Sequence, residues 1–84
     1  MTVTLTGSES TPYFLTVDAT NIYWTDEGTS PNYLNGAVRR MSKTGGPPIS
    51  IAIAQGQPHG IAVDDKYVYW VNYDSGEVRR ALKP

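Results

Sequence analysis

The side chains in this sequence that could carry out chemistry are few. There is one histidine, His59, there is no cysteine, and two of the eight carboxylates, Asp18 and Asp64, occupy matching places in two similar segments. The lack of cysteine excludes disulfides, thiolate metal ligands and a cysteine nucleophile. No Ser/His/Asp arrangement, HExxH motif or glycine-rich phosphate loop is present. The sequence therefore predicts a protein that is not an enzyme and needs no cofactor.

Two copies of one pattern carry these residues. Residues 11–26 align with residues 57–72 at an offset of 46, and residues 32–43 align with residues 72–83 at an offset of 40. The change of offset marks a six-residue insertion in the first copy, DEGTSP at 26–31. One repeating unit is about 40 residues long, a period typical of repeat architectures. Identical pairs include Pro12/Pro58, Val17/Val63, Asp18/Asp64, Tyr23/Tyr69, Trp24/Trp70, Tyr33/Tyr73, Gly36/Gly76, Val38/Val78 and Lys43/Lys83.

Each copy is predicted to begin with two short β-strands. Apolar residues alternate with small or polar ones at 15–17 and 61–63, which indicates a first strand. The runs at 22–25 and 68–71 are rich in β-branched and aromatic residues, which indicates a second strand. No segment of the chain has the period of a helix.

Two further strands complete the expected unit. A third strand follows Gly36 in the first copy and Gly76 in the second. A fourth is ISIAIA at 49–54, which follows the turn residues TGGPP. The N-terminal TVTLTG at 2–7 aligns with this fourth strand. With the strands of a unit lettered A to D, the predicted order is D-A-B-C-D-A-B-C.

The ordered motifs resemble those of a known family. In both copies P-x-x-[LI]-[TA]-V-D is followed by [IV]-Y-W-[TV]-[DN] and then by G-x-V-R-R, and in the first copy GGPP and a fourth strand follow. This set resembles YWTD-repeat β-propellers of the low-density-lipoprotein-receptor type and the related NHL-like bacterial propellers. The second motif departs from the pattern by ending in Asn72, where Asp26 closes the first. The resemblance implies an all-β fold made of four-stranded antiparallel blades.

This resemblance also implies how the chain is divided. Residues 1–84 are expected to form one propeller segment with two blade equivalents. Residues 11–56 would be the first blade, and residues 57–84 the second blade without its own strand D. Residues 1–10 would hold a strand D donated to a blade of a neighbouring chain.

Two blades cannot close a ring, so the partner expected for this chain is itself. Each blade packs face to face on its neighbours, and the two end faces of a lone pair stay open as association surfaces. A chain of this length also buries only about 60–65% of its unfolded surface. Three identical chains would supply the six blades of the resembled families, which favours a homotrimer. A homotetramer with eight blades satisfies the same strand logic.

Residues repeated in both copies are interpreted as structural. Tryptophans in strand B suit the core between blades, aspartates at the end of strand A suit turn capping, and arginines in strand C suit ion pairs or packed stems. This structural set is Asp18, Tyr23, Trp24, Arg40, Asp64, Tyr69, Trp70 and Arg80.

Loops at one end of the blades supply a candidate binding face. Propellers bring the D-to-A and B-to-C loops to one face, and here those loops are rich in aromatic, amide and acidic residues. Such a surface suits a protein, peptide or glycan ligand. The candidate residues are Tyr13, Phe14, Asp26, Glu27, Asn32, Tyr33, Gln57, His59, Asn72, Tyr73 and Asp74.

His59 is the only residue considered for a metal role. In a threefold ring three copies of it would face one axis, and they would bind a metal only if their nitrogens came within about 2.0–2.1 Å of it. The channel of a six-bladed ring is too wide for this, so no metal site is expected and an exposed or hydrogen-bonded histidine is favoured.

The charge balance limits the other partners. With seven basic and eight acidic residues the net charge is −1, which argues against nucleic acid and anionic membranes. No signal peptide or transmembrane segment is recognised, so a soluble chain of open localisation is expected. The favoured function is a natural or engineered self-assembling module. The alternatives are a ligand-binding propeller and a lactonase- or lyase-type enzyme.

Overall fold

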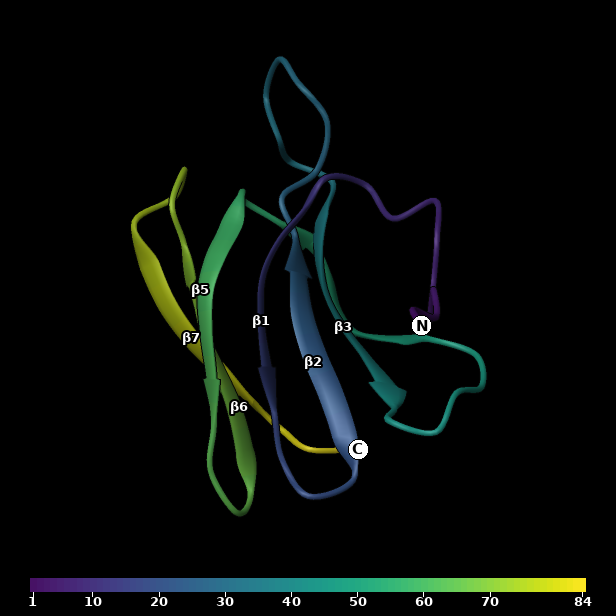
Figure 1. Cartoon of the computed structure of the whole chain (residues 1–84). Coiled ribbons are helices and arrows are strands. Elements are labelled where there is room, and N and C mark those ends of the chain that lie inside the picture. The colour runs from purple at the N-terminus through teal and green to yellow at the C-terminus, as the bar shows by residue number, and fades with distance from the viewer.

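The computed structural model describes residues 1–84 and contains two antiparallel sheets and no helix. The first sheet has the order β1-β2-β3-β4 and the second the order β5-β6-β7 (Figure 1). The predicted all-β class is confirmed, and the second sheet has one strand fewer than the first. The strands are β1 (Pro12–Val17), β2 (Asn21–Asp26), β3 (Gly36–Ser42), β4 (Ile49–Gln55), β5 (Pro58–Val63), β6 (Tyr67–Asn72) and β7 (Glu77–Leu82).

The sequence repeat is also a repeat of strand register. In the first sheet Tyr23 pairs with Arg40 across β2 and β3, and in the second Tyr69 pairs with Arg80 across β6 and β7. Both first strands carry an irregularity after their proline, between Pro12 and Leu15 and between Pro58 and Ile61. Equivalent residues of the two sheets can therefore be compared one by one.

The turns after β1 and β5 have one construction. Asp18 Oδ1 accepts hydrogen bonds from the backbone N–H groups of Thr20 (3.0 Å) and Asn21 (2.8 Å). Asp64 Oδ1 accepts the equivalent bonds from Lys66 (2.9 Å) and Tyr67 (2.8 Å). An aspartate that bonds the backbone two or three residues ahead fixes a tight turn.

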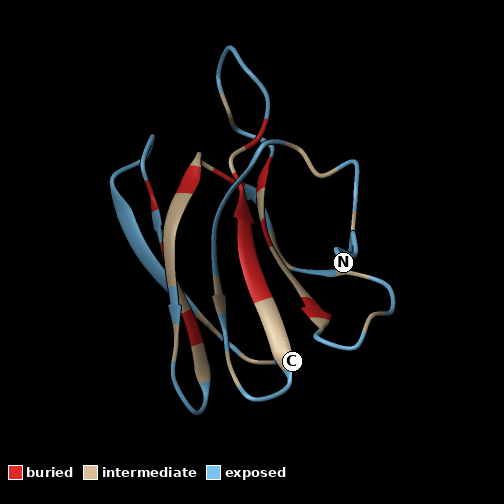
Figure 2. Ribbon diagram, viewed as in Figure 1, coloured by how far each residue is buried: buried red, intermediate tan, exposed pale blue.

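The core lies between the two sheets, which pack face to face. Tyr23 and Val38 from the first sheet meet Val68 and Trp70 from the second, and all four residues are buried. Figure 2 marks the buried stretches of the strands in red. Burying one such apolar side chain contributes about 1.5–3 kcal/mol. Partly buried residues that pack around this core are Ile51, Ala52, Ile61, Val63 and Ala81.

The predicted strand at residues 2–7 does not form within the single chain. No residue before Pro12 belongs to a strand, and the segment runs beside the first sheet (Figure 1). A strand needs a partner with free backbone groups, and residues 2–7 pair with no strand of this chain. No helix that could cross a membrane is present.

Candidate functional site

The connections before β1, β2 to β3, β4 to β5 and β6 to β7 gather at one end of the sheets (Figure 1). Three rings lie side by side there. The centroids of Tyr13 and His59 are 4.3 Å apart, and those of His59 and Tyr73 are 5.1 Å apart with ring planes inclined by only 10°. Phe14 contacts Tyr13 edge to face at 4.7 Å. The sheets thus bring together residues from both copies of the repeat.

Glu27, a residue of the insertion in the first copy, bonds to the histidine of this row and holds its ring in place. Glu27 Oε2 lies 2.6 Å from His59 Nε2 and also accepts a hydrogen bond of 3.1 Å from Gln57 Nε2. The carboxylate and the imidazole are both largely buried, whereas Tyr73 is 70% exposed. We call Tyr13, Phe14, Glu27, Gln57, His59 and Tyr73 the aromatic cluster.

Two of the expected rim residues do not lie on the exposed face. Asp26 and Asn72 end β2 and β6 and are only 5% and 2% exposed, because Asp26 is covered by Glu9 and Arg39 and Asn72 packs against Gln55. The three expected residues that are neither buried nor part of the aromatic cluster, Asn32, Tyr33 and Asp74, lie in loops. Asn32 Oδ1 accepts the N–H of Leu34 at 3.3 Å. Tyr33 and Asp74 make backbone hydrogen bonds. The Tyr33 carbonyl accepts a hydrogen bond from the N–H of Gln57 at 3.0 Å, and the Asp74 N–H donates to the carbonyl oxygen of Gly56 at 3.2 Å.

Asp26 belongs to a buried pair of acids beneath the loops. Glu9 accepts hydrogen bonds from Trp24 Nε1 (3.2 Å) and Arg39 Nε (3.1 Å), and Arg39 Nε lies 3.9 Å from Asp26 Oδ2. Burial, followed by the hydrogen bond and charge of Glu9, raises the pKa of Asp26 to about 7. Burial acts to raise the pKa of Glu9 as well, but its hydrogen bonds with Asp26 and Arg39 bring that pKa below its usual value.

Amides occupy the repeat-equivalent places, Gln55 in β4 of the first sheet and Asn72 in β6 of the second. Gln55 Oε1 accepts hydrogen bonds from Trp70 Nε1 (3.2 Å) and Asn72 Nδ2 (2.8 Å). Gln55 is 46 residues after Glu9, so the two are repeat equivalents. Sequence reasoning did not single out either residue. Extending the alignment of residues 2–7 with residues 49–54 by a few positions would have paired Glu9 with Gln55.

An ion pair joins the two sheets at the opposite end. Lys83 Nζ donates to Asp18 Oδ2 at 2.9 Å, and the Tyr23 hydroxyl donates to the same oxygen at 2.7 Å. Lys83, followed by Tyr23, holds the pKa of Asp18 well below its usual value. In the second sheet the Tyr69 hydroxyl bond, followed by backbone bonds from the turn, lowers the pKa of Asp64 to about 2. Asp64 accepts no hydrogen bond from a lysine side chain.

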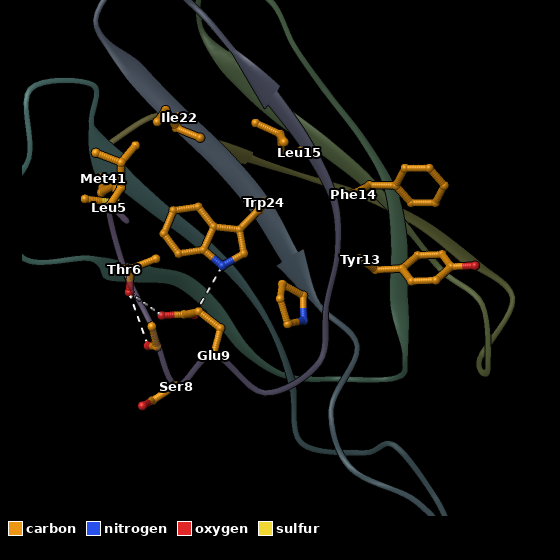
Figure 3. Close-up of a pocket in the computed structure, with 12 residues that line it drawn as sticks. Leu5, Thr6, Ser8, Glu9, Tyr13, Phe14, Leu15, Ile22, Trp24 and Met41 are labelled. Atoms are coloured by element: carbon orange, nitrogen blue, oxygen red, sulfur yellow. Dashed lines mark hydrogen bonds between the residues drawn. The ribbon is translucent and has the colours of Figure 1, made fainter. Parts of the chain in front are cut away.

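The outer face of the first sheet is an apolar groove of about 470 Å³ (Figure 3). The N-terminal segment forms one wall, where Leu5 approaches Met41 and Glu9 holds Trp24 (Figure 3). The groove residues are repeat equivalents of residues that are packed between the sheets. Thus Leu5, Leu15, Ile22, Trp24 and Met41 correspond to Ile51, Ile61, Val68, Trp70 and Ala81.

No family model, curated protein or solved structure matches this chain. Histidine and acidic residues form no group of three or more that could hold a metal ion. The geometry offers two features with which the protein could act: the apolar groove with the open face of the second sheet, and the aromatic cluster.

Proposed function

We propose that the protein is a self-assembling β-propeller segment whose copies join head to tail into a closed ring. The second sheet of one copy packs its open face into the apolar groove of the next copy. One observation carries this proposal. The residues that pack between the two sheets recur, position by position, on the two open faces of the same chain.

The open face of the second sheet is the equivalent of the buried face of the first. Tyr23 and Val38 lie in the core, and their equivalents are Tyr69 and Val78. Val78 is 79% exposed, which leaves a large apolar side chain uncovered on the edge strand β7 of the second sheet. A face of this kind is typical of an interaction surface. The groove of a second copy supplies apolar residues like those that already cover Val38.

The N-terminal segment fits the same arrangement. Ile51 in β4 packs toward the second sheet and Gln55 bonds Trp70, while β4 itself is paired with β3. Leu5 and Glu9 already make the corresponding contacts with the first sheet. What residues 2–7 lack is the strand partner, and we assign that role to β7 of the preceding copy. Each copy then donates one strand to its neighbour.

Light scattering coupled to size exclusion tests this proposal. We expect a mass of three chains of 9.2 kDa each, because the motifs resemble those of six-bladed rings. A mass of four chains would revise the number of blades and keep the head-to-tail mechanism. A folded monomer at all concentrations would overturn the proposal. Val78→Lys should dissociate the assembly, whereas Pro47→Lys, which adds the same charge in the exposed β3–β4 turn, should not.

A second candidate function is binding of a glycan or peptide by the aromatic cluster. Its support is that the row of rings is not required by the blade pattern, since Tyr13 aligns with His59 and Phe14 with Gly60. Exposed aromatic rings beside amide and carboxylate groups suit such ligands. A glycan array and a peptide array give the test. Signal that disappears with Tyr73→Ala and persists with Lys66→Ala, at the opposite end, would support the proposal, and an absence of signal on both would oppose it.

A further inference from the structure

The Asp18 and Asp64 turns differ in one contact. Both aspartates cap their turns with Oδ1 and accept a tyrosine hydroxyl on Oδ2, from Tyr23 at 2.7 Å and from Tyr69 at 2.6 Å. Asp18 Oδ2 also accepts Lys83 Nζ, which completes its set of donors. Asp64 has no such donor, although its side chain is held in the same orientation by the same kinds of bonds.

A second lysine occupies the place in the first sheet that Lys83 occupies in the second. The backbone N–H of Lys83 donates to the carbonyl oxygen of Lys66 at 2.8 Å. The backbone N–H of Lys43 donates to the carbonyl oxygen of Thr20, the repeat equivalent of Lys66, at 3.0 Å. The two lysines therefore leave their sheets at equivalent points. Lys83 reaches across to the preceding sheet of its own chain. Lys43 is exposed and makes no side-chain hydrogen bond or ion pair.

We propose that Lys43 of one copy binds Asp64 of the preceding copy, in the geometry in which Lys83 binds Asp18 within one chain. This inference rests on the proposed head-to-tail assembly. The sheet that precedes the first sheet in a ring is the second sheet of another copy, which carries the Asp64 turn. Each junction between chains then repeats the polar contact found between the sheets of one chain.

The charge pair fixes the direction of association. The apolar faces supply most of the attraction, but apolar contact is not directional. A lysine opposite an aspartate favours one orientation and register, whereas like charges brought together disfavour the others. In a head-to-head encounter of two second sheets the Asp64 turns, each of which also carries Asp65, would face one another. The Lys43–Asp64 pair selects the arrangement that leads to a ring.

Zero-length carbodiimide cross-linking of the unmodified protein tests the pair directly. Chains labelled with ¹⁵N are mixed with unlabelled chains, dissociated and reassembled before coupling. We expect a peptide pair that joins Lys43 to Asp64 and contains one labelled and one unlabelled chain. The internal control is the Lys83–Asp18 cross-link, whose two peptides must both be labelled or both be unlabelled because they come from one chain. An assembly that gives the control but no Lys43–Asp64 product would overturn the inference while the assembly proposal stands.

A double-mutant cycle gives the independent measurement. Lys43→Glu should weaken association about tenfold or more, because the new carboxylate faces Asp64 at the junction. In the Asp64→Asn background, where an amide still caps the turn, the same change should cost less than about threefold. Asp65→Asn is the matched control and should leave the effect of Lys43→Glu unchanged. Equal effects in both backgrounds would overturn the pairing, and a monomeric wild type would instead overturn the proposed function.

Discussion

Val38 and Val78 occupy the same position in β3 and β7, yet Val38 is fully buried and Val78 is 79% exposed. The difference does not come from the strands, whose register is the same. It comes from the neighbours: β4 pairs beside Val38 and the second sheet covers it, whereas Val78 lies in the edge strand β7 with no sheet over it. Val38 therefore reports on the contact within a chain, and Val78 lies on the face for which we propose a contact between chains.

Shortening each valine should separate the two contacts. Val38→Ala removes buried methyl groups and should lower the free energy of unfolding by about 2 kcal/mol. Val78→Ala should have a similar effect only where chains associate. Urea unfolding at a low and a high protein concentration measures both. A Val78→Ala effect that is absent at both concentrations would contradict the assignment of this face to association.

Removal of the N-terminal segment should abolish assembly and leave the sheets folded. A chain without residues 1–8 loses Leu5 from the groove and the strand assigned to the neighbouring β7, but keeps all seven strands. The full chain should show a melting temperature that rises with protein concentration, since association stabilises only the folded state. The truncated chain should show no such rise. A truncated chain that still assembles would remove strand donation from the mechanism.

Much of this architecture was predictable because it follows from local pattern. The period of two, the turn residues and the repeat predicted every strand from β1 to β7. The burial of Asp26 and Asn72 was missed because polar residues at the ends of strands are usually exposed. Two features depend on how segments distant in the sequence pack, so the local pattern did not predict them. They are the contact of Glu9 with Trp24 and the row of rings formed by Tyr13, His59 and Tyr73. The strand predicted at residues 2–7 does not form in the single chain, and in the assembly that we propose its partner belongs to a second chain.

Asp26 should make the protein less stable as the pH rises through the weakly acidic range. Its pKa is about 7 in the folded state, above the 3.8 of an ordinary aspartate, so the folded state binds more protons than the unfolded state between these values. Stability is then lost from about pH 4 to about pH 7. Above pH 7 the ionised Asp26 faces Glu9, and its Oδ1 has no hydrogen-bond partner.

Asp26→Asn should remove this pH dependence, since it installs the amide that Asn72 supplies in the second sheet. Melting temperatures from pH 4 to 8 should fall for the wild type and stay level for the variant. At pH 8 the variant should gain on the order of 1–3 kcal/mol, the usual cost of a buried polar group without a partner. Asp65→Asn, at an exposed turn position, is the control. A wild type that is most stable near pH 8 would contradict the prediction.

Deletion of DEGTSP at 26–31 should leave the fold intact. The deletion joins Thr25 to Asn32, which gives YWTNY in place of the YWVNY of the second copy. Asn32 then takes the place of Asp26 at the end of β2, which removes one acid of the buried pair. Asn72 shows that an amide fits at this position.

The same deletion removes Glu27 and so frees His59, and the aromatic cluster should loosen while the sheets persist. Near-ultraviolet circular dichroism should keep the tryptophan signal, and the histidine ring resonances should shift. An unfolded deletion variant would mean that the insertion is part of the structural core, and the assignment of residues 26–31 to a functional loop would be wrong.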